Sequence, residues 1–152
     1  MTVNVYPNYN EDTYGWALHT AELLKEGKMD QVDFENIIEE IESLGRSERR
    51  ELISRLEVLL QHLLKWCYQP QKRTRSWQLT IQHQRNKLFS VLDDNPSLKT
   101  LETLTKSIKE AYKSAILKAA IETELESTTF PQDCPYSFEE IMNDNFYPEA
   151  SA

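Results

Sequence analysis

Apolar residues recur at intervals of three and four along most of this chain, and no segment alternates apolar and polar residues with a period of two. That spacing places apolar side chains on one face of an α-helix, whereas a half-buried strand would need the alternation. Only three glycines occur among 152 residues, which argues against glycine-rich phosphate loops and nucleotide-binding fingerprints. The predicted fold class is all-α, a single-domain helical bundle with no sheet.

Six helices are expected, four long and two short, in one domain over residues 1–152. Residues 1–10 lack helical spacing and are expected to form an extended N-terminal arm, and residues 127–136 an irregular strap. Ser137 and Glu140 match a capping box, which predicts a short final helix after the strap. The expected helices cover residues 13–26, 34–45, 48–68, 77–94, 96–125 and 138–143.

Capping residues set several of these boundaries. Asp12, Asp33 and Ser47 are predicted N-caps, because a short polar side chain accepts a hydrogen bond from a free backbone N–H of the first turn. Gly27 and Gly45 are predicted helix ends. The helix after Ser47 should be the central one, since the apolar residues of its second half cover more than one face. These residues are Leu56, Val58, Leu59, Leu60, Leu63, Leu64, Trp66 and Cys67.

The charge and the cysteines limit the class of protein. With 25 acidic and 17 basic residues the net charge is -8, which disfavours a surface built uniformly for nucleic acid or anionic membranes. No apolar run reaches the roughly 18 residues of a membrane span, and the start lacks the pattern of a signal peptide. Cys67 and Cys134 lack a CxxC spacing and are expected to be reduced thiols, with a mutual disulfide as the alternative. A cytoplasmic protein without a cofactor is expected.

Several motifs recur in a specific order along almost the whole chain. They include Tyr14-Gly15-Trp16-Ala17, Gly45-Arg46-Ser47-Glu48-Arg49-Arg50-Glu51-Leu52, His62-Leu63-Leu64-Lys65-Trp66, Asn95-Pro96-Ser97-Leu98 and Cys134-Pro135. In these motifs the chain resembles a bacterial family known as domain of unknown function family twenty-nine. The resemblance implies an all-helical fold and no assigned activity, so it supplies no catalytic residues.

A basic segment runs from Lys65 to Lys87, with six cations and no acid between Glu57 and Asp93. Because the whole chain carries -8, the rest of it carries -14. Aromatic residues lie between these cations, and such a surface suits single-stranded nucleic acid or a phosphate ligand. The stronger interpretation is ion pairing, within the chain or between chains, with an acidic stripe on a neighbouring helix. That stripe consists of Glu35, Glu39 and Glu42.

Three more arginines lie near the start of the helix predicted after Gly45, where the helix dipole disfavours positive charge. A partner carboxylate or phosphate would compensate for it. The candidate binding residues are Arg46, Arg49, Arg50, Arg73, Arg75, Trp77 and Arg85.

Arg55 and His62 stand two turns apart on one helix face and resemble the R-x4-6-H pattern of the helical HEPN ribonucleases. That resemblance implies His62 as general acid or base and Arg55 as phosphate ligand. The stronger interpretation is a hydrogen-bonded core histidine. No Glu-x-x-His or His-x3-His spacing occurs, so no metal site is expected.

The function expected from these patterns is a protein-interaction or self-associating helical module, with enzymatic activity not favoured. Long amphipathic helices dimerise readily, and the central helix is apolar over more surface than a small bundle needs. The alternative is an RNA-binding protein or a HEPN-like ribonuclease that uses Arg55 and His62, with nucleic acid held along Lys65 to Lys87.

Overall fold

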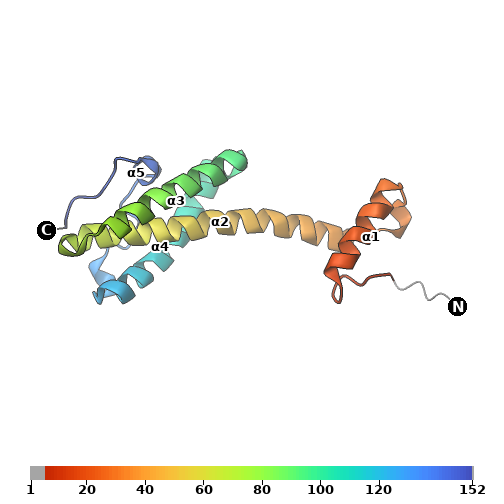
Figure 1. Ribbon diagram of the computed structural model, residues 1–152, viewed down its shortest axis with the longest axis horizontal. Helices are drawn as coiled ribbons and strands as arrows, with labels where there is room; N and C mark the ends of the chain where they lie inside the picture. Colours follow the sequence, from red (N-terminus) through yellow and green to blue (C-terminus); the bar gives the residue numbers. More distant parts are fainter. Residues whose placement is uncertain (1–5, 152) are drawn as a thin grey trace. The chain divides into compact units, whose positions relative to one another are not determined.

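The structure is a computed structural model that describes residues 6–151 (Figure 1). Over this range it contains α-helices and short 3-10 turns and no strand, which confirms the all-α class. The helices are α1 (Thr13–Lys25), α2 (Phe34–Tyr68), α3 (Arg75–Asp94), α4 (Leu101–Thr123) and α5 (Phe138–Met142). The 3-10 turns are η1 (Met29–Gln31), η2 (Pro70–Lys72), η3 (Pro96–Lys99) and η4 (Ser127–Thr129).

The helix break predicted at Gly45 is wrong, because α2 continues from Phe34 to Tyr68 and joins the two segments expected as separate helices. A glycine inside a helix costs only about 1 kcal/mol relative to alanine, and good helix formers on both sides offset that cost. Ser47 is therefore an interior residue and not an N-cap. The predicted end of this helix before Gln69-Pro70 is confirmed.

The chain divides into two compact units, Met1–Gly45 and Arg46–Ala152. In the N-terminal unit, Asp12 caps α1 by accepting a hydrogen bond from the Gly15 N–H at 2.9 Å. Gly27 adopts a φ of 72°, the left-handed conformation that follows a helix end. The caps predicted at Asp12 and Asp33 and the end predicted at Gly27 are confirmed.

The predicted N-terminal arm lies partly outside the described residues, which begin at Tyr6. Residues 9–11 form a turn, with a hydrogen bond from the Asp12 N–H to the Asn8 carbonyl at 2.8 Å. Tyr9 then packs edge-on against Trp16, and its hydroxyl donates to Glu40 at 2.5 Å. This segment therefore ties α1 to the first turns of α2 inside the N-terminal unit.

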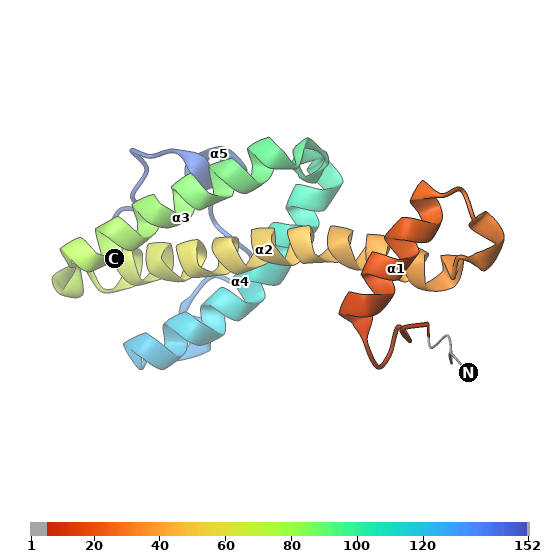
Figure 2. The same ribbon diagram turned by 45° about the vertical axis from the view of Figure 1, so that its right-hand side comes forward.

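In the C-terminal unit, α3 and α4 lie on different sides of α2 (Figure 2). Three ion pairs join α2 to α4, and α2 supplies a cation, an anion and a cation in turn. They are Arg49 with Glu110, Glu57 with Lys118, and Lys65 with Glu122. The core between the helices includes Leu52, Leu56, Leu59, Leu60, Leu63, Leu64, Ile81, Leu88, Ala111, Ala115 and Ile141.

The last helices are bounded largely as predicted. Pro96 opens the 3-10 turn η3 and not α4, which begins at Leu101 after its N-cap Thr100. The capping box of Ser137 and Glu140 is confirmed at the start of α5. Cys67 and Cys134 are free thiols whose Sγ atoms donate to backbone carbonyls.

Candidate functional site

Arg85 is a core residue in the structure. Its side chain is 2 % exposed, and its guanidinium donates to three carbonyls at the end of the chain. The acceptors are Ile141 at 2.8 Å, Glu140 at 3.4 Å and Phe146 at 2.7 Å. Burial lowers the pKa of Arg85, and Tyr147 stacks near its charge with its ring centroid 5.5 Å away. Arg85 therefore fastens the C-terminal segment to α3 and cannot reach a surface partner.

Arg73 also makes its contacts inside the fold. Its Nε donates to the Trp66 carbonyl at 2.9 Å, and its guanidinium lies 4.7 Å from the Trp66 ring centroid. Lys65 lies over the Trp77 ring, 4.4 Å from its centroid. Arg73 and Arg85 thus bind backbone carbonyls and aromatic rings inside the C-terminal unit, and ion pairing of the basic segment with the acidic stripe stays a prediction.

The other candidate binding residues are exposed or half-buried. Arg75 and Arg50 are exposed, and Trp77 is half-buried. Arg49 binds Glu110 at 3.0 Å. Because α2 does not begin here, Arg46, Arg49 and Arg50 lie inside a helix and the dipole argument made for them does not apply.

Arg55 and His62 are half-buried and both make hydrogen bonds inside the fold. Arg55 donates to Glu51 at 2.9 Å, and His62 Nδ1 lies 2.8 Å from the Val58 carbonyl. A carbonyl only accepts, so Nδ1 carries the proton and Nε2 keeps a lone pair in the neutral ring. Burial lowers the pKa of His62 and so favours this neutral form. The ribonuclease hypothesis stays a prediction.

Residues 6–151 contain neither a cluster of metal-ligating side chains nor a membrane-spanning helix. No group of three or more potential metal ligands occurs within that range. None of the helices there is long and apolar enough to cross a membrane.

The N-terminal unit exposes an apolar row along the start of α2. Phe34, Ile38, Ile41 and Leu44 recur at spacings of four, three and three, which places them on one side of the helix. Their exposed fractions are 48 %, 54 %, 65 % and 66 %. We call these four residues the α2 apolar row. Large side chains left exposed at helical spacing form a surface suited to docking another helix.

Helix α1 in the same unit carries apolar residues on two opposite sides. Trp16, Thr20 and Leu23 are buried, whereas Tyr14 and Leu18 are exposed. A helix that needed only to cover its own unit would require a single apolar side. The exposed side therefore adds apolar surface to the N-terminal unit beyond what its own fold uses.

The N-terminal unit is also strongly acidic. Residues 6–45 contain ten acids and two bases, whereas residues 46–152 contain fifteen of each. The entire net charge of -8 therefore lies in the N-terminal unit. On α2, Glu35, Glu39 and Glu42 run along one side of the α2 apolar row, and Glu40 lies on the other side.

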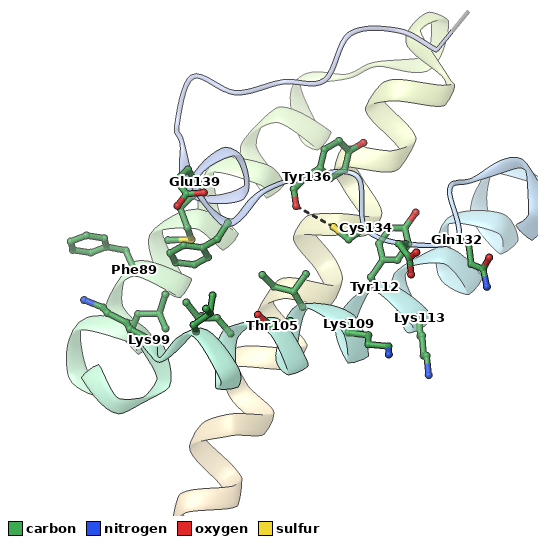
Figure 3. Close-up of a pocket in the computed structure, with 17 residues that line it drawn as sticks. Phe89, Lys99, Thr105, Lys109, Tyr112, Lys113, Gln132, Cys134, Tyr136 and Glu139 are labelled. Atoms are coloured by element: carbon green, nitrogen blue, oxygen red, sulfur yellow. Dashed lines mark hydrogen bonds between the residues drawn. The ribbon is translucent and has the colours of Figure 1, made fainter.

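A second candidate site is a cavity of about 890 Å³ in the C-terminal unit, which we call the α3–α4 cavity (Figure 3). Helices α3, α4 and α5 and the segment before α5 form its walls. Its apolar lining consists of Phe89, Leu92, Leu101, Leu104, Ile108, Tyr112, Cys134, Tyr136, Phe138 and Met142. The charged lining residues are Lys99, Lys109, Lys113, Asp133 and Glu139.

Comparison with known proteins assigns the chain to a family. The family model of the domain of unknown function DUF29 matches residues 8–147. The chain belongs to the DUF29 family. No curated protein and no solved structure matches this DUF29 chain significantly. The resemblance inferred from the motifs is confirmed, and the family brings no activity with it.

Sequence reasoning about this DUF29 chain missed both sites for different reasons. The spacing of the α2 apolar row predicts one apolar side of a helix, but periodicity cannot tell a covered face from an exposed one. The α3–α4 cavity draws residues from α3, α4 and the irregular segment 132–136, whose placement no periodic pattern predicts.

Proposed function

We propose that this DUF29 protein is a cytoplasmic protein-interaction module that binds a basic amphipathic helix of a partner on the α2 apolar row. The observation that carries the proposal is the row itself, four large apolar side chains about half or more exposed within a strongly acidic unit. An amphipathic helix buries such a row in recurring anchor contacts at i, i+3, i+4 and i+7.

The charge of the N-terminal unit selects the class of partner. Carboxylates lie on both sides of the α2 apolar row, so the edges of a docked helix would meet negative charge. Lysine or arginine at those edges would be attracted, and acidic residues would be repelled. Apolar contacts would then supply most of the affinity, while charge would supply specificity and speed of association.

The same charge argues against a second copy of the chain as the occupant. Two N-terminal units that met through their α2 apolar rows would bring together two charges of -8. Like charges at an interface disfavour the pairing, and the repulsion would be strongest at low salt. Self-association is therefore the competing outcome of the test and not the proposal.

A defined pair of peptides tests this function. One peptide is an amphipathic helix with leucine on one face and lysine on the other, and the second has glutamate in place of lysine. Fluorescence anisotropy of the labelled peptides should show binding of the lysine peptide alone, weakened as salt rises. Replacing Ile38 and Ile41 with serine should weaken binding by at least about tenfold, since both side chains would be buried in the complex.

Ile121→Ser is the matched control, because Ile121 is 78 % exposed on α4 in the other unit. It should leave binding unchanged. Equal binding of both peptides, or an equal loss in Ile121→Ser, would contradict the proposal. Sedimentation of the protein alone, with dimers lost in Ile38→Ser/Ile41→Ser, would assign the row to self-association instead.

A further inference from the structure

We propose that the α3–α4 cavity binds a free long-chain carboxylate, with its aliphatic chain among the apolar lining residues and its carboxylate on the lysines of the rim. The site lies wholly in the C-terminal unit, so this inference stands on observations independent of the proposed peptide surface.

The size and lining of the cavity point to a small apolar ligand. Its volume of about 890 Å³ lies within the roughly 300–1,000 Å³ range of ligand sites. Leu104 and Ile108 of α4 line it together with Phe138 and Met142 of α5. Phe89 and Leu101, which also line it, are among the exposed large apolar residues of the chain. An aliphatic chain would cover apolar surface that now meets water.

Two polar groups of the cavity lining already have hydrogen-bond partners. The Tyr112 hydroxyl donates to the Pro131 carbonyl at 2.5 Å, and the Cys134 thiol donates to the Tyr136 carbonyl at 3.6 Å. Burial raises the pKa of Tyr112, Tyr136 and Cys134, so all three remain neutral at physiological pH. A polar ligand body would lose its hydration and find few neutral partners other than Thr105 and Gln132, whereas an alkyl chain loses no hydrogen bonds.

The rim supplies the charge that selects the head group. Lys99, Lys109 and Lys113 are exposed lining residues, and within residues 6–151 none of them makes an ion pair. Figure 3 shows Lys109 and Lys113 extending from α4, with Glu139 on the opposite rim. Asp133 also lines the cavity, so the rim carries three cations and two anions. Lys109 and Lys113 lie together on the α4 side, apart from Lys99 of η3, and a carboxylate placed beside them would meet lysine and not glutamate.

The test compares two ligands with the same chain and opposite charge, dodecanoate and dodecylammonium, by calorimetry on the full chain. Dodecanoate should bind with one-to-one stoichiometry and about tenfold more tightly than dodecylammonium, because each rim pair contributes only a modest energy. In Lys109→Gln/Lys113→Gln this preference should fall to about threefold or less. Lys106→Gln, an exposed lysine on α4 that does not line the cavity, should keep the full preference.

A second variant tests where the aliphatic chain of the ligand binds. Thr105 is an exposed lining residue, so Thr105→Trp should fill the cavity without removing a core side chain, and dodecanoate binding should be lost while the melting temperature is kept. Absence of dodecanoate binding to the wild-type protein would overturn the inference. So would binding that Thr105→Trp leaves intact, or a head-group preference that Lys109→Gln/Lys113→Gln leaves unchanged.

Discussion

The two units of the chain use their apolar residues in opposite ways. In the C-terminal unit, Leu59, Leu60 and Leu63 are fully buried, and its acids and bases are equal in number. Among the described residues 6–45 of the N-terminal unit, the buried apolar residues are Trp16 and Leu23, while the α2 apolar row is exposed and the net charge of the unit is -8. The C-terminal unit therefore buries a large apolar core even though Phe89, Leu101 and Ile121 stay exposed, whereas the N-terminal unit buries little apolar surface and exposes the α2 apolar row.

The largest effect expected in the C-terminal unit comes from Arg85→Ala. The change leaves three carbonyl acceptors without their donor and opens a void around a side chain that is 2 % exposed. Loss of such a buried charged partner should cost about 4 kcal/mol in the free energy of unfolding. Urea denaturation measures it. Arg75→Ala removes an exposed arginine of the same helix and should change the stability by less than about 0.5 kcal/mol.

One core substitution and one surface substitution compare the two units directly by their cost in the free energy of unfolding. Leu60→Ala empties a fully buried position in the C-terminal unit and should cost about 3 kcal/mol. Ile41→Ala trims a side chain that is 65 % exposed in the N-terminal unit and should cost less than about 0.5 kcal/mol. Equal costs in the two variants, measured by the same denaturation, would refute the difference between the units.

Two glycines test where the helices end. Gly45 has no other atom within 4 Å of an added Cβ, so Gly45→Ala should stabilise α2 by about 0.5–1 kcal/mol. Gly27, with a φ of 72°, should instead lose about 1 kcal/mol on replacement with alanine. Thermal unfolding followed by circular dichroism distinguishes the two. Destabilisation by Gly45→Ala would mean that the helix breaks there after all.

The smallest effect is a dependence on pH in the C-terminal unit. Burial lowers the pKa of His62 below its usual 6.5, so the folded state resists the proton that the unfolded state takes up. Stability should be complete above about pH 6.5 and should fall as the pH is lowered towards the folded-state pKa. Denaturation midpoints at about pH 7.5 and pH 5.5 measure the difference, which His62→Gln should reduce. A rise in stability on acidification would contradict the assignment.

The sequence predicted local features well, because their causes are local. The cap at Asp12, the end at Gly27 and the capping box of Ser137 each depend on residues within four positions. The helix end predicted at Gly45 is wrong, because the conformation of a glycine depends on whether its neighbours favour continuing the helix. The predicted end of α2 before Gln69-Pro70 is confirmed, because proline cannot continue a helix.

The candidate sites could not be predicted in the same way. The sequence makes Arg85 a candidate binding residue, and only the placement of α5 and of the segment after it shows that carbonyls surround Arg85. The carbonyls of Glu140 and Ile141 belong to the end of α5 and that of Phe146 to the segment after it, and a residue pattern does not encode their position. The sequence shows the basic character of the Lys65 to Lys87 segment, whereas the partners of Arg73 and Arg85 are tertiary contacts.

Amide hydrogen exchange of the full chain, with and without the basic amphipathic peptide, tests the difference between the units most directly. Without peptide, residues 59–64 should exchange slowest, and residues 34–44 much faster because little packs on that part of α2. With peptide, exchange should slow in residues 34–44 and stay unchanged in residues 59–64. Protection that appears in the C-terminal unit instead, or no protection at saturating peptide, would contradict the assignment of the α2 apolar row as the docking surface.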